Sequence, residues 1–223
     1  MNKWIMAGTA AAFTGAAAFA RSEYERTHLD IVHYDIKTDK LGLEWNGFKA
    51  VFLSDLHDNS FGMENEELLA AIEKEQPDIV VIGGDMLVVK GWDAPHFDML
   101  ANLYRKLVKR YPVYYAFGNH EQRMKEEPLT YPGWWQSYWK VLKDSGMHVL
   151  VNKSEEIIKN GTAMRISGIT LPRECYRKGR IPSLSAGYID KKIGKASDKN
   201  FELLLAHTNL CKDICRLGCR FGT

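Results

Sequence analysis

The sequence has few cysteines and lacks the spacing that marks a cysteine-based site. Cys175 stands alone, and three further cysteines lie at intervals of four residues near the carboxyl end. A zinc knuckle or a redox pair needs two cysteines that are separated by two residues, and no such pair occurs. The sequence therefore offers no support for either kind of site.

The chain also lacks an excess of charge of either sign. It contains 30 Lys and Arg and 28 Asp and Glu, a formal net charge of +2. This balance implies no polyelectrolyte partner, and no nucleic-acid-binding module is apparent. At 223 residues and 45% hydrophobic content, the chain can bury one sizeable core and has little room for two. We expect a monomer.

Long uncharged runs are absent except at the amino terminus, where residues 4–20 lie between Lys3 and Arg21. The run is at the short end for a membrane-spanning helix, and Ala18-Phe19-Ala20 fits a signal-peptidase site. No paired arginines precede it, so a twin-arginine signal is not supported. Residues 1–27 could thus form an uncleaved membrane anchor, a cleaved export signal or an Ala-rich soluble helix. Lys3 favours a body outside the cytoplasm, at the cell membrane or secreted.

Apolar strand patterns alternate with helical patterns along the rest of the chain. Helical periodicity covers residues 63–76, 95–110 and 134–144. Asn160-Gly161 is a strong hairpin signal between 157–158 and 163–169. The other predicted strands are 29–41, 48–53, 78–82, 113–117, 147–151 and 201–206. This order predicts an α/β fold with a largely parallel sheet joined to a more antiparallel one.

Four of the predicted strands end in residues of metal-ligand type. They are Asp55 with His57, then Asp85, then Asn119 with His120, and finally His207. In α/β proteins, ligand sites gather at the carboxyl ends of the strands, so these side chains are expected to meet. Carboxylate, imidazole and amide oxygen together suit Mn²⁺, Fe²⁺ or Zn²⁺, and they argue against an iron–sulfur or purely calcium site.

These motifs resemble those of the calcineurin-like metallophosphoesterases. The matching stretches are Asp55-Leu56-His57, Gly84-Asp85, Gly118-Asn119-His120-Glu121 and His207, in the family's order. The resemblance implies a catalytic domain over residues 28–207 with a two-sheet sandwich flanked by helices (αββα). Together with the leading apolar segment, the motifs resemble the membrane-associated or exported bacterial branch, which acts on phosphoesters.

The resemblance also implies a role for each residue. His120 would be a proton donor or charge stabiliser at the leaving-group oxygen, oriented by Asp55 or Glu121. Two divalent ions would lower the pKa of a bridging water and give a hydroxide nucleophile. The substrate would be a small-molecule or lipid-linked phosphodiester, phosphomonoester or pyrophosphate. The first ion would be bound by Asp55 and His57, both ions by Asp85, and the second by Asn119 and His207.

The sequence departs from the family pattern in two places. Val88 stands where the family often has Asp or Arg, and the closing Gly-His-x-His is absent. Residues 208–223 also differ from the family's continuation, but codons for residues 211–222 read one base later can encode a similar run. We therefore expect residues 208–223 to be an aberrant tail that results from a frameshift. We also expect the domain to lack its C-terminal strands. The alternative to an active enzyme is a catalytically impaired, membrane-tethered remnant.

Overall fold

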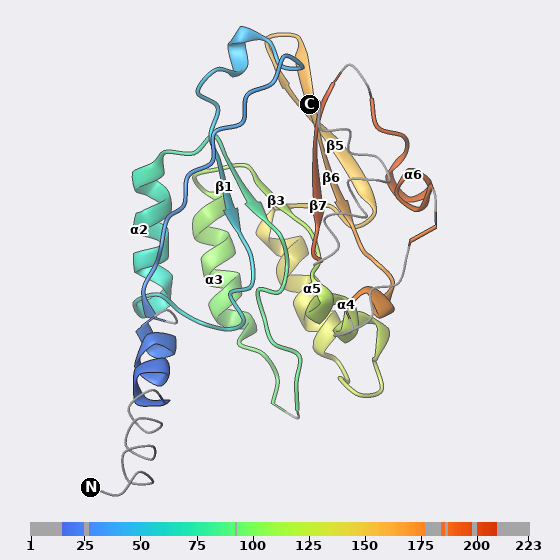
Figure 1. Cartoon of the computed structure of the whole chain (residues 1–223). Helices are drawn as coiled ribbons and strands as arrows, with labels where there is room; N and C mark the ends of the chain where they lie inside the picture. Colours follow the sequence, from blue (N-terminus) through green and yellow to red (C-terminus); the bar gives the residue numbers. More distant parts are fainter. Residues whose placement is uncertain are drawn as a thin grey trace, which may run out of the picture.

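A computed structural model describes residues 15–24, 27–91, 93–176, 184–185, 187–197 and 200–208. A helix over residues 15–24 projects away from the body of the molecule (Figure 1). Much of the predicted anchor or signal segment, and all of the predicted tail except residue 208, lie outside the described residues. Within these ranges, no helix combines the length and the apolar character needed to cross a bilayer.

The first sheet is parallel throughout, with the strand order β1-β2-β3-β4. Parallel neighbours need a crossover, and a helix lies in each of the three connections. The strands are β1 (Ala50–Leu53), β2 (Ile79–Ile82), β3 (Val113–Tyr115) and β4 (His148–Val149). The crossover helices are α2 (Glu66–Glu75), α3 (Phe97–Val108) and α5 (Trp134–Ser145), and α4 (Asn119–Glu126) precedes α5.

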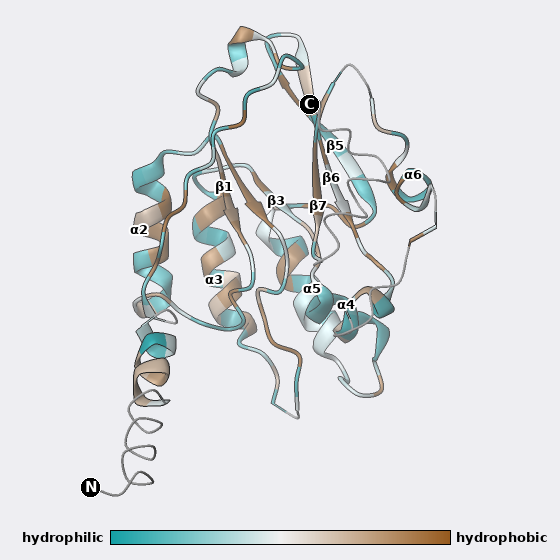
Figure 2. Ribbon diagram, viewed as in Figure 1, coloured by the Kyte–Doolittle hydropathy of each residue, from teal (hydrophilic) through white to brown (hydrophobic). Residues whose placement is uncertain are grey.

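Strand β2 shows why the first sheet needs cover on both faces. Val80 and Ile82 belong to the apolar cluster that includes the inner sides of α2, α3 and α5. Ile79 and Val81 belong to a second cluster, shared with the second sheet. All four side chains are buried, because in a strand successive side chains point to opposite faces. Figure 2 shows the apolar colour of β1 and its neighbouring strand in the middle of the fold.

The second sheet has the order β5-β6-β7 and mixed direction. Its strands are β5 (Lys153–Lys159), β6 (Thr162–Ile169) and β7 (Phe201–Ala206). β5 and β6 form the predicted antiparallel hairpin, and β7 pairs parallel to β6. The turn residues Asn160 and Gly161 have φ of 49° and 88°, as a two-residue turn of this hand requires.

Helix α6 (Tyr188–Ile193) covers the outer face of the second sheet. Its Ile189 is buried with Ile169 and Leu171, and Leu204 of β7 packs against them. The layers are therefore helix, sheet, sheet and helix (Figure 1), so the predicted αββα sandwich is confirmed. Short 3-10 helices occupy η1 (Leu43–Trp45), η2 (Met63–Asn65) and η3 (Arg173–Tyr176).

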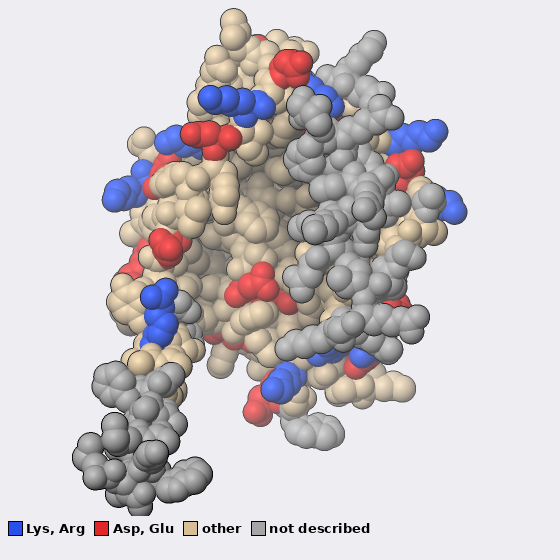
Figure 3. All heavy atoms as spheres, in the orientation of Figure 1, with Lys and Arg blue, Asp and Glu red and all other residues tan. Residues whose placement is uncertain are grey.

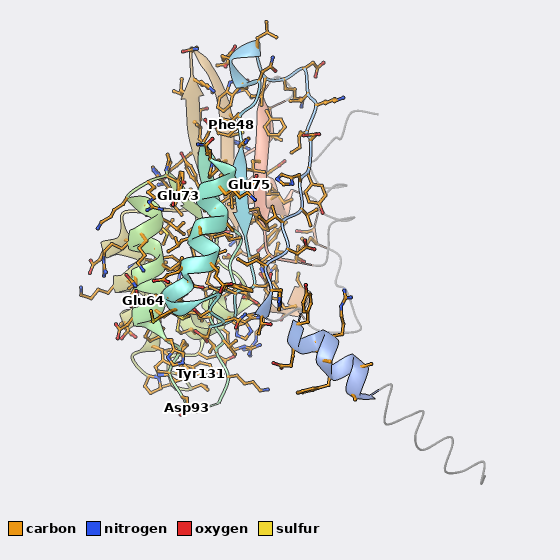
Figure 4. The ribbon with its side chains drawn as sticks, turned by 90° about the vertical axis from the view of Figure 1, so that its left-hand side faces the viewer. Phe48, Glu64, Glu73, Glu75, Asp93 and Tyr131 are labelled. Atoms are coloured by element: carbon orange, nitrogen blue, oxygen red, sulfur yellow. The ribbon has the colours of Figure 1, made fainter. Side chains whose placement is uncertain are left out.

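The strand predicted over residues 29–41 is wrong. The alternation is real, but a strand also needs a hydrogen-bonded partner, and none pairs with this segment within the described ranges. Tyr34 remains 84% exposed as a result. The segment is tied to α2 by His33 Nε2, which lies 2.9 Å from Glu75 Oε2. Figure 4 labels Glu75 on α2, with an extended stretch of chain running beside the helix.

Candidate metal centre

All six predicted site residues lie together at the carboxyl ends of the strands. Asp55 and His57 follow β1, and Asp85 follows β2. Asn119 and His120 form the first turn of α4, which begins directly after the β3 loop. His207 directly follows β7 and comes from the second sheet. The site thus lies where the two sheets meet.

The loops after β1 and β2 hold their side chains through an unusual backbone. Asp55, His57, Asp58 and Asp85 all have φ between 51° and 57°, the left-handed region that non-glycine residues rarely adopt. The N–H groups of Asp55 and His57 each lie 3.1 Å from carbonyl oxygens of the facing loop, at Gly84 and Asp85. Such a conformation costs on the order of 1–3 kcal/mol per residue, and clusters of it are typical of functional sites.

Two glycines allow the β2 and β3 loops to touch. A Cβ atom on Gly84 would lie 2.0 Å from the backbone nitrogen of Gly118. A Cβ atom on Gly118 would lie 2.1 Å from Asp85 Oδ1. Any larger residue at either position would therefore displace the Asp85 carboxylate or separate the two loops.

Asp85 is the centre of the site, and only 3% of it is exposed. Its Oδ1 accepts a hydrogen bond of 2.8 Å from the backbone N–H of His120, in the first turn of α4. The positive end of the helix dipole favours a carboxylate there. Its Oδ2 faces three imidazole nitrogens: Nε2 of His207 at 3.2 Å, of His57 at 3.4 Å and of His120 at 4.0 Å.

The ligand-type atoms form two groups that share Asp85. One group is His57, Asp85 and His120, and the other is Asp55, Asp85 and His207. Asp85 is the residue common to both groups. The expected pairing of Asp55 with His57 is less distinct, because Asp55 Oδ1 is 3.7 Å from His57 Nε2 and 3.8 Å from His207 Nε2.

The carboxamide of Asn119 lies against the Asp85 carboxylate. With its nitrogen turned toward Asp85, it donates to Asp85 Oδ2 at 3.1 Å, and its oxygen accepts from the backbone N–H of His120 at 3.2 Å. Rotation of the amide would instead present its oxygen to a cation. Together with the neighbouring carboxylates and imidazoles, this set of donor atoms suits a divalent metal ion.

The electrostatics of the site centre on the pair formed by Asp85 and His207. Burial lowers the pKa of His207, but the hydrogen bond and charge of Asp85, with the charge of Asp55, outweigh it and raise this pKa to about 9. Burial alone would raise the pKa of Asp85, but the hydrogen bonds from His207 and His120 outweigh this effect. The pKa of Asp85 is therefore lowered. Without a metal, a proton on His207 balances the Asp85 carboxylate.

Glu121 does not orient His120, contrary to one of the two expectations for that ring. Its Oε2 accepts from the N–H groups of Asp85 (3.0 Å) and Gly118 (2.9 Å). Its Oε1 accepts from the N–H of Met86 and the hydroxyl of Tyr115. Burial, together with the charge of Asp85, raises the pKa of Glu121. This fully buried carboxyl group therefore ties the β2 loop to the β3 loop.

His120 is held instead by a residue that sequence reasoning missed. The backbone N–H of Val89 donates to His120 Nδ1 at 2.8 Å. A backbone donor leaves no signal in the sequence, so only the fold reveals it. Burial is the main reason why the pKa of His120 is lowered.

The site opens into a hollow of about 360 Å³. Asp55, Asn119 and His207 line its polar end, and Phe52 and Leu204 contribute apolar wall. Figure 3 shows acidic atoms exposed near the middle of this face of the molecule.

Comparison with known proteins agrees with this geometry. The sequence model described as calcineurin-like phosphoesterase matches residues 48–211, which is more than half of the chain. The chain belongs to the calcineurin-like phosphoesterase family. The matched region holds all six predicted site residues, from Asp55 to His207.

A bacterial protein is also similar to this calcineurin-like phosphoesterase. It is a Bacillus subtilis (strain 168) protein described as the uncharacterized metallophosphoesterase YkoQ. The two are 32% identical over 117 residues, which is 52% of this chain and 41% of the relative. The chain thus spans about two fifths of the length of this relative.

Proposed function

We propose that the chain is a metal-dependent phosphoesterase that binds two divalent ions and hydrolyses phosphodiester bonds, or phosphomonoester or pyrophosphate bonds. The observation that carries the proposal is the position of Asp85 Oδ2, which two groups of ligand-type atoms share. Family membership supports the class of reaction. Bound ions would activate water and neutralise the oxygens of the phosphoryl group.

The chain's own residues would orient the substrate and supply a proton. Asp85, nearly buried and held by the backbone N–H of His120 in α4, fixes the distance between the two halves of the site. His120 Nε2 faces the same point and would hydrogen-bond an oxygen of the phosphoester. The hollow lined by Asp55 and Asn119 would admit a small-molecule or lipid-linked substrate.

The membrane location stays a prediction from the sequence. We propose that residues 1–27 hold the body at the outer face of the cell membrane, or direct its secretion if the signal is cleaved. The uncharged run over residues 4–20 supports this proposal. Cell fractionation of a tagged full chain, with protease treatment of intact spheroplasts, tests the location and the orientation together.

Hydrolysis of bis-p-nitrophenyl phosphate and p-nitrophenyl phosphate with added Mn²⁺ or Zn²⁺ tests the activity. We expect metal-dependent release of nitrophenol that is lost in Asp85→Asn and His207→Ala. The matched control is His33→Asn, which removes an exposed imidazole that contacts α2 and should leave the rate unchanged. Release that is equal in all four proteins, or that resists chelators, contradicts the proposal.

A further inference from the structure

Backbone groups contact two histidines of the site at the same ring nitrogen, Nδ1. One of these groups accepts a hydrogen bond and the other donates one. His207 Nδ1 lies 3.2 Å from the carbonyl oxygen of Gly83, which is an acceptor. His120 Nδ1 lies 2.8 Å from the backbone N–H of Val89, which is a donor. A neutral imidazole carries one proton, so the partner at Nδ1 decides which ring nitrogen bears it.

The two rings therefore suit different tasks. In its neutral form His207 donates from Nδ1 to Gly83, and its Nε2 presents a lone pair toward Asp85. His120 accepts at Nδ1, so its Nε2 carries the proton. Coordination of an ion through His120 Nε2 would move this proton to Nδ1, and two N–H donors would then face each other at 2.8 Å. The contact with Val89 opposes coordination by His120.

We propose that the backbone N–H of Val89 is a positioning group that fixes His120 as a neutral Nε2–H donor and keeps this ring out of metal coordination. The inference rests on the proposed function, in which the Nε2–H would donate to an oxygen of the bound phosphoester. It separates His120 from His57, although distance alone groups both rings with Asp85 as ligand-type residues.

The surroundings of Val89 show that its N–H is firmly placed. The side chain of Val89 is fully buried. Its carbonyl oxygen accepts from Arg123 Nη1 at 3.3 Å, so α4 contacts both polar groups of this residue. The preceding N–H, of Val88, donates to Asp58 Oδ2 at 2.8 Å. The loop after β2 is thereby clamped between α4 and the loop after β1.

Nitrogen NMR of the histidine rings tests the tautomer directly. Two-bond proton–nitrogen correlation spectra of the ¹⁵N-histidine-labelled full chain distinguish Nε2–H from Nδ1–H, and His120→Asn identifies the signals of residue 120. We expect the Nε2–H pattern for His120 both without metal and with Zn²⁺. An Nδ1–H pattern in the metal-free protein overturns the proposal.

Removing the Val89 donor tests whether that group sets the tautomer. Val89→Pro lacks the N–H, and we expect it to convert His120 to a mixture of tautomers. If the proline variant does not fold, an amide-to-ester replacement at residue 89 removes the same N–H and keeps the side chain. An unchanged Nε2–H pattern in the folded variant, or in the ester, overturns the role of Val89.

Metal affinity gives an independent readout. Zn²⁺ titration of His120→Asn should show a loss of affinity below the roughly 10-fold that marks even an outer-shell partner, because the ring is not a ligand. His57→Asn should lose at least the roughly 10–100-fold that even an outer-shell partner contributes. Equal losses in both variants overturn the proposal. If the wild type binds no Zn²⁺, the proposed function fails, and the metal-free spectrum still decides the role of Val89.

Discussion

At the scale of single residues, the charge of Asp85 controls the protonation of His207. Its Oδ2 lies 3.2 Å from His207 Nε2, and the pKa of His207 is about 9. Asp85→Asn removes that charge and leaves the burial and the charge of Asp55, so we expect the pKa of His207 to fall from about 9 toward its usual 6.5. An NMR titration of the metal-free protein measures it. Asp98→Asn, which changes an exposed carboxylate on α3, should leave the pKa near 9.

Protonation of His207 also determines how metal affinity depends on pH. Below its pKa of about 9, His207 must release a proton before it can bind an ion. Affinity for Mn²⁺ or Zn²⁺ should therefore rise about 10-fold per pH unit toward pH 9 and level off above it. Calorimetry across this range checks the slope. His207→Gln should bind more weakly and lose most of the dependence, and an equal slope in both proteins would contradict the assignment.

The sequence predicts that these side chains converge, because each follows an apolar strand. Asp55, Asp85 and His207 needed only the strand boundaries and the rule that such ends converge. The hydrogen-bond partners of these residues could not be predicted from the sequence. The expectation that Glu121 orients His120 failed because the backbone donors of two loops occupy the Glu121 carboxylate. Backbone donors are the same in every sequence, so their positions follow only from the fold.

At the scale of elements, the β5–β6 turn is set by local chemistry. Gly161 has a φ of 88°, and a Cβ atom there would meet nothing within 4 Å. Gly161→Val should therefore destabilise the protein by about 1–2 kcal/mol through backbone strain alone. Gly161→Asn should lose less, since asparagine tolerates this region. Urea unfolding with a constant m-value measures the difference, and equal midpoints would show that the turn has another conformation.

Residues 29–41 show the limit of element prediction. The alternation of apolar and polar residues there is as clear as in the segments that do form strands. Secondary structure of this kind depends on a partner from elsewhere in the chain, which periodicity does not report. Helix α4 was not predicted from the sequence, for a related reason. Its first turn depends on Glu121 reaching back to the N–H of Gly118, within a motif whose chemistry suggested a loop.

At the scale of the whole molecule, Gly168 sets how closely the two sheets approach. It lies on β6, and a Cβ atom there would be 2.0 Å from the carbonyl oxygen of Leu150, which follows β4. Gly168→Ala must move one sheet relative to the other. We expect a loss of about 1–3 kcal/mol of stability, as for other overpacked sites.

The same substitution should also weaken metal binding, because His207 moves with the second sheet. Calorimetry and urea unfolding on one preparation measure both effects. Gly15→Ala is the control, since its added methyl meets nothing within 4 Å in the helix over residues 15–24. A Gly168→Ala protein with lower stability and unchanged metal affinity would show that the sheets shift without displacing His207.

The position of His207 on β7 also imposes an order of assembly. The other predicted ligands all follow strands of the first sheet, whereas His207 joins them only after the second sheet has docked. Contacts between residues so distant in the chain slow folding, because loop closure is entropically costly. A chain whose second sheet has not docked lacks one of the predicted ligands, so we expect it to bind an ion less tightly than the folded protein. The kinetics of metal capture would then report the final docking step of folding.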